Sequence, residues 1–187
     1  RKQGLAININ AGGGYNEFEG NGYSIRNNIY NDSSNFFNTT NNYTNKSLRP
    51  NFRANIDYDI NKTNILNLVL NYNQNSYDNS NNTEYQNINR FDELWRLSRR
   101  QVQSEGDNYS PNLNLTYTWK RKLGETVRII MGYNFSSNQN DRLFYQQFFN
   151  PDFTPNGIDS MQQQLNNTKS NNYSVRVNYD KMLDNKK

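Results

Sequence analysis

The sequence predicts an all-β fold: an antiparallel up-and-down transmembrane β-barrel segment of about eight strands, with short turns at one end and long loops at the other. Three observations lead to this prediction. Apolar and polar residues alternate with a period of two in several segments, the connections between these segments alternate between short and long, and aromatic residues lie near strand ends.

Two predicted hairpins show the alternation most clearly. Apolar or aromatic residues occupy every second position in four segments, 52–60 paired with 66–72 and 113–119 paired with 127–135. Short polar linkers, 61–64 and 120–125, join the members of each pair. Successive side chains of a strand point to opposite faces, so each hairpin has one apolar face and one face made mostly of amides.

Weaker copies of the pattern flank these hairpins. The same alternation occurs in residues 5–11, 23–30, 36–44 and 173–179, which brings the total to about eight strands. The polar segment 31–35 predicts a turn between two of them. The glycines at 12–14 lack the strand and helix context of a phosphate loop, so they predict a bulge or bend within a strand.

The predicted connections differ at the two ends of the sheet. Those at 31–35, 61–64 and 121–126 are short, whereas those at 44–51, 73–109 and 138–171 are long. Transmembrane barrels have short periplasmic turns and long extracellular loops, and aromatic girdles at both membrane interfaces. Aromatic residues lie near the ends of several predicted strands, namely Tyr72, Trp119, Tyr133, Phe135 and Tyr179. Both features favour a membrane barrel over a soluble sandwich.

Composition excludes several classes of function. The chain has 187 residues with no Cys and no His, so it has no disulfide, thiolate nucleophile, imidazole base or usual zinc site. We therefore predict that the protein is not an enzyme, has no cofactor, and has neither catalytic nor metal-binding residues. Apolar runs are only triplets such as 68–70, far short of a membrane helix. The mean hydropathy of −1.14 still suits a barrel, because only every second residue of its membrane band is apolar.

Three stretches resemble a known family. Residues 48–58 (LRPNFRANIDY), 64–73 (NILNLVLNYN) and 109–117 (YSPNLNLTY) resemble strands of the outer-membrane β-barrel region of TonB-dependent receptor-like proteins. The abundance of Asn and Tyr suits the members of this family from Bacteroidota. The resemblance is one of rhythm and composition, and it contains no invariant motif, so no functional residue of the family is carried over.

The resemblance implies a location and partners. Such proteins sit in the outer membrane of Gram-negative cells, form a barrel of about 22 strands filled by a plug, and import scarce nutrients with energy from an inner-membrane complex. Residues 1–4 lack an initiator Met and read as a cut end, so we expect residues 1–187 to be part of a single barrel domain without its plug and remaining strands. The implied partners are outer-membrane lipid, the rest of the barrel or other outer-membrane proteins, and an unknown small solute.

We interpret the charged motifs as structural features and not as binding sites. The carboxylates at 57 and 59 share one strand face with Arg53, which favours a polar lumen row over a cation site. The acids Asp141, Asp152 and Asp159 lack the close spacing of a calcium loop. The basic run 120–122, together with Arg96, Arg99 and Arg100, carries too little net charge (+4 for the chain) for a nucleic-acid surface, so no nucleic-acid partner is expected.

Two segments keep alternatives open. Residues 91–100 fit either a short helix or an extension of the sheet, with Trp95 as a packing residue. Residues 144–153 interleave aromatics with amides and have the best claim to a recognition role, through stacking on sugars or contact with a protein. The simpler interpretation of 144–153 is that these residues extend strands or cover the barrel mouth. Ligand-binding residues therefore stay unassigned.

The functional hypothesis is a non-catalytic outer-membrane receptor or transporter wall that admits or binds a nutrient solute. The alternative is a soluble secreted or surface β-sheet protein that acts in adhesion or protein interaction. An eight-stranded barrel complete in itself is also allowed by the number of strands. The membrane hypothesis requires the apolar rows to be free of any second sheet or helix layer of the same molecule.

Overall fold

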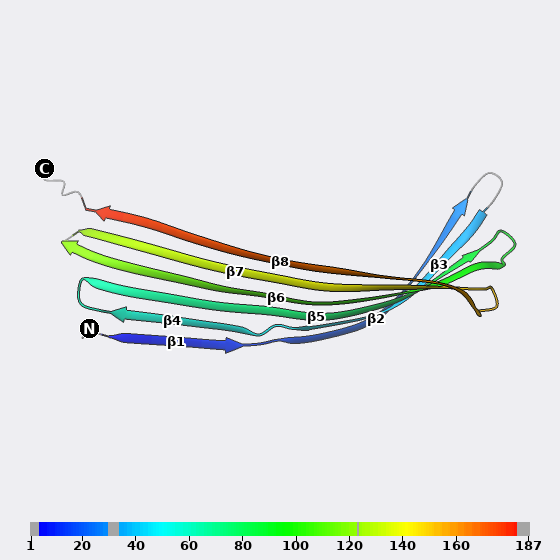
Figure 1. Ribbon diagram of the computed structural model, residues 1–187, viewed down its shortest axis with the longest axis horizontal. Helices are drawn as coiled ribbons and strands as arrows, with labels where there is room; N and C mark the ends of the chain where they lie inside the picture. Colours follow the sequence, from blue (N-terminus) through cyan, green and yellow to red (C-terminus); the bar gives the residue numbers. More distant parts are fainter. Residues whose placement is uncertain (1–3, 30–33, 123, 183–187) are drawn as a thin grey trace.

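The computed structural model describes residues 4–29, 34–122 and 124–182, and its regular structure in these ranges is entirely β-strand. The eight strands are β1 (Leu5–Gly12), β2 (Tyr15–Ile29), β3 (Ser34–Leu48), β4 (Asn51–Asp59), β5 (Asn64–Ile88), β6 (Leu94–Lys122), β7 (Glu125–Phe149) and β8 (Pro155–Lys181). They form one antiparallel sheet (Figure 1). The all-β antiparallel prediction, with about eight strands, is confirmed.

β1 and β2 together form one long strand with a single interruption, and β3 and β4 together form another. β1 pairs with β4 and β2 pairs with β3 in one continuous register. The interruption lies where Gly13 and Gly14 face Pro50 and Arg49. Pro50 has no N–H to donate, but Gly14 and Arg49 still exchange backbone hydrogen bonds of 3.2 and 2.8 Å. The bend expected at glycines 12–14 is therefore a break shared by two neighbouring strands.

The chain runs up and down along the sheet. The order is β1-β4-β5-β6-β7-β8, while β3 continues the path of β4 and pairs with both β2 and β5. The strand formed by β1 and β2 lies at one edge and β8 lies at the other (Figure 1). Within the described ranges these two edges do not pair with each other, so the sheet is open.

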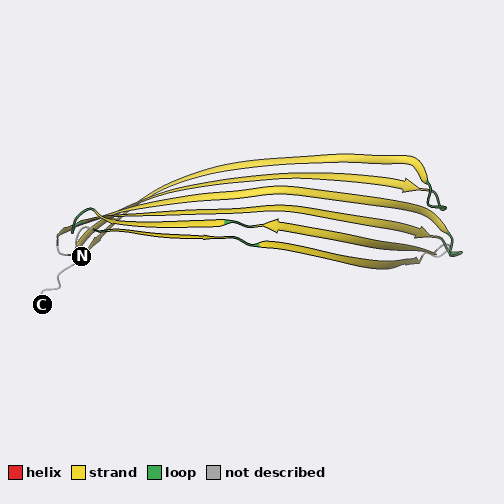
Figure 2. Ribbon diagram, turned by 90° about the horizontal axis from the view of Figure 1, so that it is seen from below, coloured by secondary structure: helices red, strands yellow, loops and turns green. Residues whose placement is uncertain are grey.

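The sheet is a single layer of long, twisted strands (Figure 2). Among the described residues, only three apolar side chains are buried: Ala54, Leu97 and Phe149. No helix in this part of the chain is long and apolar enough to cross a membrane. With no second layer, both faces of the sheet are open over most of their area.

Tight turns close the two ends of the sheet. At the end that we call near, the side chain of Asn61 accepts hydrogen bonds from the backbone N–H groups of Thr63 and Asn64 at 2.9 and 2.8 Å. At the far end, the N–H of Asn89 donates to the carbonyl of Glu93 at 2.9 Å, and Asn150 donates to Thr154 in the same way at 2.8 Å. We call the parts of the sheet next to these two ends the near half and the far half.

The long loops predicted at one end are wrong. Residues 73–88 and 94–109 belong to β5 and β6, and residues 138–149 and 155–171 belong to β7 and β8. The stretch 44–51 likewise lies within β3 and β4 apart from the two-residue break. Neither face of these extensions is consistently apolar, so the sequence lacks the alternation that marks a strand. Their backbone hydrogen bonds to neighbouring strands hold them extended, independently of side-chain type.

Other predicted elements have clear outcomes. Residues 91–100 contain no helix: they form a turn followed by the start of β6 at Leu94, so the extension of the sheet is the correct alternative. The hairpins at 52–72 and 113–135 form as predicted. The residues outside the described ranges are 1–3, 30–33, Leu123 of the basic turn, and 183–187. Residues 30–33 include the end of the strand predicted at 23–30 and part of the turn predicted at 31–35.

Candidate functional site

One face of the near half, which we call the band face, carries a continuous apolar surface across six strands. The register places the alternating apolar residues side by side, as in the row Ile7, Ile56, Leu68, Leu115, Met131 and Val175. The whole surface, named here the apolar band, consists of Leu5, Ile7, Ile9, Ala11, Phe52, Ala54, Ile56, Tyr58, Leu66, Leu68, Leu70, Tyr72, Pro111, Leu113, Leu115, Tyr117, Trp119, Val127, Ile129, Met131, Tyr133, Phe135, Tyr173, Val175, Val177 and Tyr179.

The apolar band contains no Asp, Glu, Lys or Arg. On β6 it runs from Pro111 to Trp119, a length of about 30 Å at the usual rise of a strand. A strand tilted by about 40° would cover roughly 23 Å of membrane with this length, close to the apolar height of outer-membrane barrels. Charged residues appear on the same face only beyond the band, for example Glu17, Asp107 and Lys169 toward the far end.

Aromatic residues mark both limits of the apolar band. Tyr58, Tyr117, Trp119 and Tyr179 lie at the near limit, and Phe52, Tyr72, Phe135, Tyr133 and Tyr173 lie at the far limit. At the far limit the hydroxyl of Tyr72 donates to Gln74 at 2.8 Å and that of Tyr133 donates to Asn171 at 2.9 Å. These rings therefore lie against the band while their hydroxyl groups bind the polar residues just outside it.

The band is open to its surroundings. Val175 is 73% exposed and Ile7 is 57% exposed, although both lie in the middle row of the band. An uninterrupted apolar surface of this extent is far larger than the patches that isolated soluble proteins expose. The near half of the sheet therefore needs an apolar environment on this face.

The opposite face of the near half, which we call the amide face, is polar. One row across it consists of Asn10, Arg53, Asn71, Asn112, Asn134 and Asn172. The side chain of Asn67 donates to Asn55 at 3.1 Å and to Asp57 at 2.6 Å. Asp57, one of the two carboxylates in residues 57–59, is thus part of this hydrogen-bonded polar surface.

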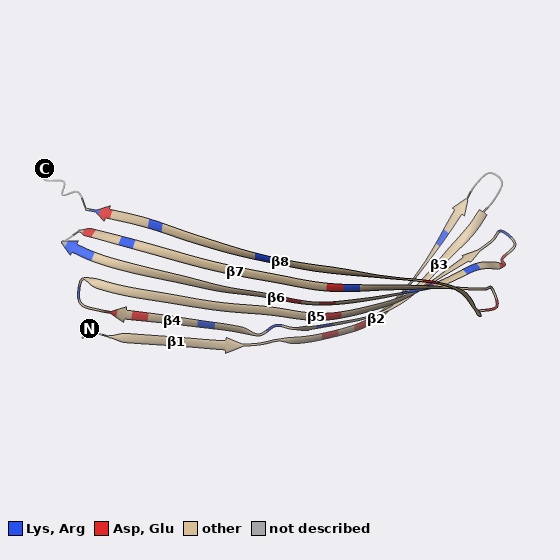
Figure 3. Ribbon diagram, in the orientation of Figure 1, with Lys and Arg blue, Asp and Glu red and all other residues tan. Residues whose placement is uncertain are grey.

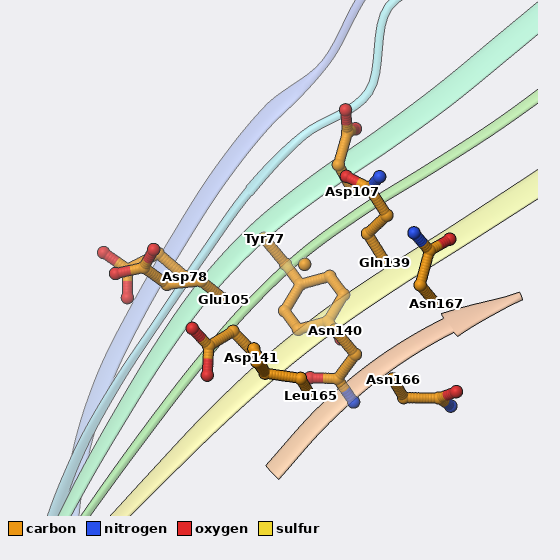
Figure 4. Close-up of a pocket in the computed structure, with 11 residues that line it drawn as sticks. Tyr77, Asp78, Glu105, Asp107, Gln139, Asn140, Asp141, Leu165, Asn166 and Asn167 are labelled. Atoms are coloured by element: carbon orange, nitrogen blue, oxygen red, sulfur yellow. The ribbon is translucent and has the colours of Figure 1, made fainter. Parts of the chain in front are cut away.

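In the far half, the band face becomes acidic. Asp78, Glu105 and Asp141 occupy one cross-strand row, and Asp107 lies in the next row. Figure 3 shows Asp and Glu on the ribbons of β5 and β7 in this part of the sheet. They line a shallow hollow of about 790 Å³ (Figure 4). Gln74 and Ser76 each donate to Asp107 at 2.9 Å, and Gln163 donates to Asp141 at 2.8 Å. Within the described ranges, no group of three or more His, Cys, Asp or Glu is placed to hold a metal ion.

Tyrosine rings cover two glycines on the amide face. Tyr77 lies opposite Gly106, and Tyr43 lies opposite Gly20. A Cβ atom added at either glycine would overlap the facing ring. These glycines therefore provide the space that lets each ring lie flat across its neighbouring strand.

The amide face of the far half carries arginines stacked on aromatic rings. The guanidinium carbon of Arg26 lies 5.0 Å from the ring centre of Phe37, and that of Arg96 lies 5.1 Å from Phe148. Arg100 is 5.9 Å from Tyr85, and Arg142 is 5.7 Å from Phe144. Phe37 and Tyr85 also stack at 5.7 Å. All four arginine side chains are exposed, whereas the rings are half-buried.

The sequence suggested considering Arg96, Arg99 and Arg100 together with the basic run 120–122, but the structure places these three arginines on different faces. Arg99 lies on the band face, where it forms a 2.8 Å ion pair with Glu84. Arg96 and Arg100 lie on the amide face. The full set of four arginines, Arg26, Arg96, Arg100 and Arg142, was missed because its members come from three strands, β2, β6 and β7. Once the register is known, the odd or even position of each arginine along its strand shows which face it lies on, and this assigns all four arginines to the amide face.

The aromatic segment 144–153 is also divided between the faces. Its first part is strand, so Phe144 and Phe148 lie on the amide face while Tyr145 and Phe149 lie on the band face. Only 150–153 form a turn. The interpretation that these residues extend a strand is therefore correct for 144–149.

Hydrogen bonds change the pKa of several far-half groups. The hydroxyl of Tyr15 and the ammonium of Lys46 lower the pKa of Glu17, and Glu17 in turn raises the pKa of Lys46. Donation from Thr154 lowers the pKa of Asp152 in the turn. The carboxylate of Asp159 raises the pKa of Tyr145. These groups are paired on the surface, and none of the shifts indicates a catalytic acid or base.

The sequence matches no protein-family model and no curated protein. The apolar band, the amide face and the charge distribution of the far half are the features from which a function follows.

Proposed function

We propose that this chain forms part of the wall of an outer-membrane β-barrel, a non-catalytic receptor or transporter of the TonB-dependent type that admits or binds a solute. In this arrangement, acyl chains contact the apolar band and water fills the space on the amide face. The far half then extends beyond the membrane on the side opposite the near turns. Its partners are membrane lipid and the strands that complete the barrel.

The apolar band carries this proposal. It is uncharged, spans six strands, has aromatic residues at both limits, and is covered by no other part of the described chain. A soluble protein would lose stability by leaving such a surface in water, because burial of apolar area is the main driving force of folding. Lipid is the environment that matches both the height of the band and its aromatic limits.

The open edges support the need for further strands. An unpaired backbone N–H or C=O group in hydrocarbon costs several kcal/mol, so membrane sheets close on themselves. The edges here are β1 with β2 on one side and β8 on the other. We propose that residues 1–187 are one part of a single barrel domain and that neighbouring strands pair with both edges.

A pair of adjacent substitutions tests the proposal. Leu68 lies in the middle row of the apolar band, and Val69 points to the amide face between Asn55 and Asn114. Leu68→Arg should destabilise the protein in lipid vesicles by about 2–4 kcal/mol, because it places a charge at mid-membrane, while Val69→Arg should cost about 0–1 kcal/mol. Both values are measured by urea titration of the complete barrel that contains this chain, inserted in vesicles, with unfolding followed by circular dichroism and heat-modifiable migration.

Each variant replaces an apolar residue by Arg, so a difference between the two costs reflects the face of the sheet and not the loss of an apolar side chain. Equal costs would contradict a lipid-facing band. A monodisperse chain that keeps its β-structure without detergent would instead favour the soluble surface protein that acts in adhesion.

A further inference from the structure

The arginines and aromatic rings on the amide face of the far half form one surface. We call it the arginine–aromatic surface, and it consists of Arg26, Phe37, Tyr85, Arg96, Arg100, Arg142, Phe144 and Phe148. The register places these residues on the same side of β2, β3, β5, β6 and β7. The surface is thus continuous across five neighbouring strands.

Charge is strongly segregated between the two faces of the far half. In the described strands of the far half, the amide face carries no Asp or Glu. The carboxylates all lie on the band face: Glu17, Glu19, Asp78, Glu84, Glu105, Asp107, Asp141 and Asp159. An anion near the far half is therefore attracted to one face and repelled from the other.

The arginines keep hydrogen-bond donors available for a ligand. Arg100 uses Nε and Nη2 to bind the side-chain oxygen of Gln146 at 3.0 and 2.7 Å, and Arg142 uses Nε to bind Ser104 at 3.0 Å. These contacts fix the guanidinium planes but leave other N–H groups of each plane unused. Stacking on a ring holds the flat side of a guanidinium and directs its N–H groups outward from the ring edge.

Three chemical groups suited to one class of ligand meet on this surface. Guanidinium groups bind carboxylate or sulfate in a planar, two-point geometry. Half-buried aromatic rings offer flat apolar contact area. Amides in the adjoining rows, such as Asn87, Gln146 and Gln162, donate and accept hydrogen bonds as sugar hydroxyls require.

We propose that the arginine–aromatic surface binds acidic saccharides, that is, sugars that carry carboxylate or sulfate groups. The inference rests on the proposed function for its setting, since a lipid-facing band puts this surface on the inside of the barrel mouth, where an entering solute meets it first. The binding chemistry itself depends only on the residues of the surface.

The test compares two variants of the full chain with the same change in charge. Arg96→Gln/Arg100→Gln/Arg142→Gln removes three positive charges from the arginine–aromatic surface. Lys46→Gln/Arg99→Gln/Lys169→Gln removes three positive charges from the band face of the same half. Isothermal titration of the complete barrel that contains this chain, in detergent micelles, uses trigalacturonate, a sulfated disaccharide derived from heparin, and maltotriose as a neutral control.

The unmodified chain should bind trigalacturonate or the sulfated disaccharide at least about tenfold more tightly than maltotriose, and added salt should weaken this binding. The first variant should lose about tenfold or more in affinity, and the second should stay within about twofold. Binding of only one acidic probe would identify carboxylate or sulfate as the recognised group. Equal weakening in both variants, or equal affinity for maltotriose, would overturn the proposal.

Two comparisons keep the result interpretable. The preference for an acidic over a neutral saccharide is measured on the unmodified chain, so it decides the proposal even if a triple variant does not fold. The Leu68→Arg and Val69→Arg pair reports on the membrane setting separately. Acidic-saccharide binding by a chain that fails the membrane test would refute the proposed function alone, and membrane insertion without such binding would refute only this inference.

Discussion

At the scale of single residues, the far-end turns combine good hydrogen bonding with one unfavourable backbone angle. Phe153 has φ of 66° and Asp92 has φ of 64°, in equivalent places of two similar turns. The left-handed region costs most residues about 1–2 kcal/mol, but Asp tolerates it better than Phe. The side chain of Phe153 is 53% exposed, so packing offsets little of this cost.

We predict that Phe153→Gly stabilises the chain by about 0.5–1 kcal/mol, because relief of the backbone angle outweighs the extra freedom of glycine in the unfolded state. Asp92→Gly should have a smaller effect. Urea unfolding in detergent micelles measures both. As a control, Asp152→Gly should destabilise, since the Asp152 carboxylate accepts hydrogen bonds from the backbone N–H and hydroxyl of Thr154 at 3.0 and 2.6 Å. A loss of stability in Phe153→Gly would show that its ring packs in a way that its exposure does not indicate.

At the scale of strands, the contact between Tyr77 and Gly106 couples β5 to β6. We predict that Gly106→Ala destabilises the sheet by about 1–2 kcal/mol, because the added methyl group forces the ring of Tyr77 out of its position. Gly14→Ala is the matched control: no atom lies within 4 Å of the new methyl group, so it should be close to neutral. Thermal unfolding followed by circular dichroism measures the difference.

A second substitution identifies the cause of the lost stability. In a Tyr77→Ala background, Gly106→Ala should cost clearly less than in the unmodified chain, because the overlapping ring is gone. An unchanged cost would mean that the backbone near Gly106, rather than the ring, sets the requirement for glycine.

The strands of the near half and parts of β2 and β3 could be predicted from sequence, whereas the far-half parts of β5, β6, β7 and β8 could not, for a physical reason. Around Leu66, Leu68 and Leu70 one face is apolar, so a period of two marks both the strand and its orientation. In a stretch such as 79–83 both faces are polar, and the sequence carries no such contrast. Arg99 and Arg100 show the consequence at the candidate site: they are adjacent in sequence, but only the register assigns them to opposite faces.

At the scale of the whole molecule, the two edges of the sheet differ from its interior. In the interior, both the N–H and the C=O groups of a strand find partners on neighbouring strands, whereas β8 pairs only with β7. We predict that alternate amides of β8, and of β1 with β2, exchange hydrogen within minutes in the isolated chain, while amides of β6 are protected far longer. Hydrogen exchange followed by mass spectrometry or NMR measures this pattern. Slow exchange along β8 would show that its free edge is paired, either by closure or with another molecule.

The length of the strands has a further consequence for how a barrel built from them would look from outside the cell. β6 has 29 residues and so extends for about 95 Å, roughly three times the thickness of the hydrocarbon core of a bilayer. In the proposed setting most of β5, β6, β7 and β8 would extend beyond the lipid as a tall, stiff wall. A solute, an antibody or a phage would contact the far ends of these strands before it reached the membrane surface.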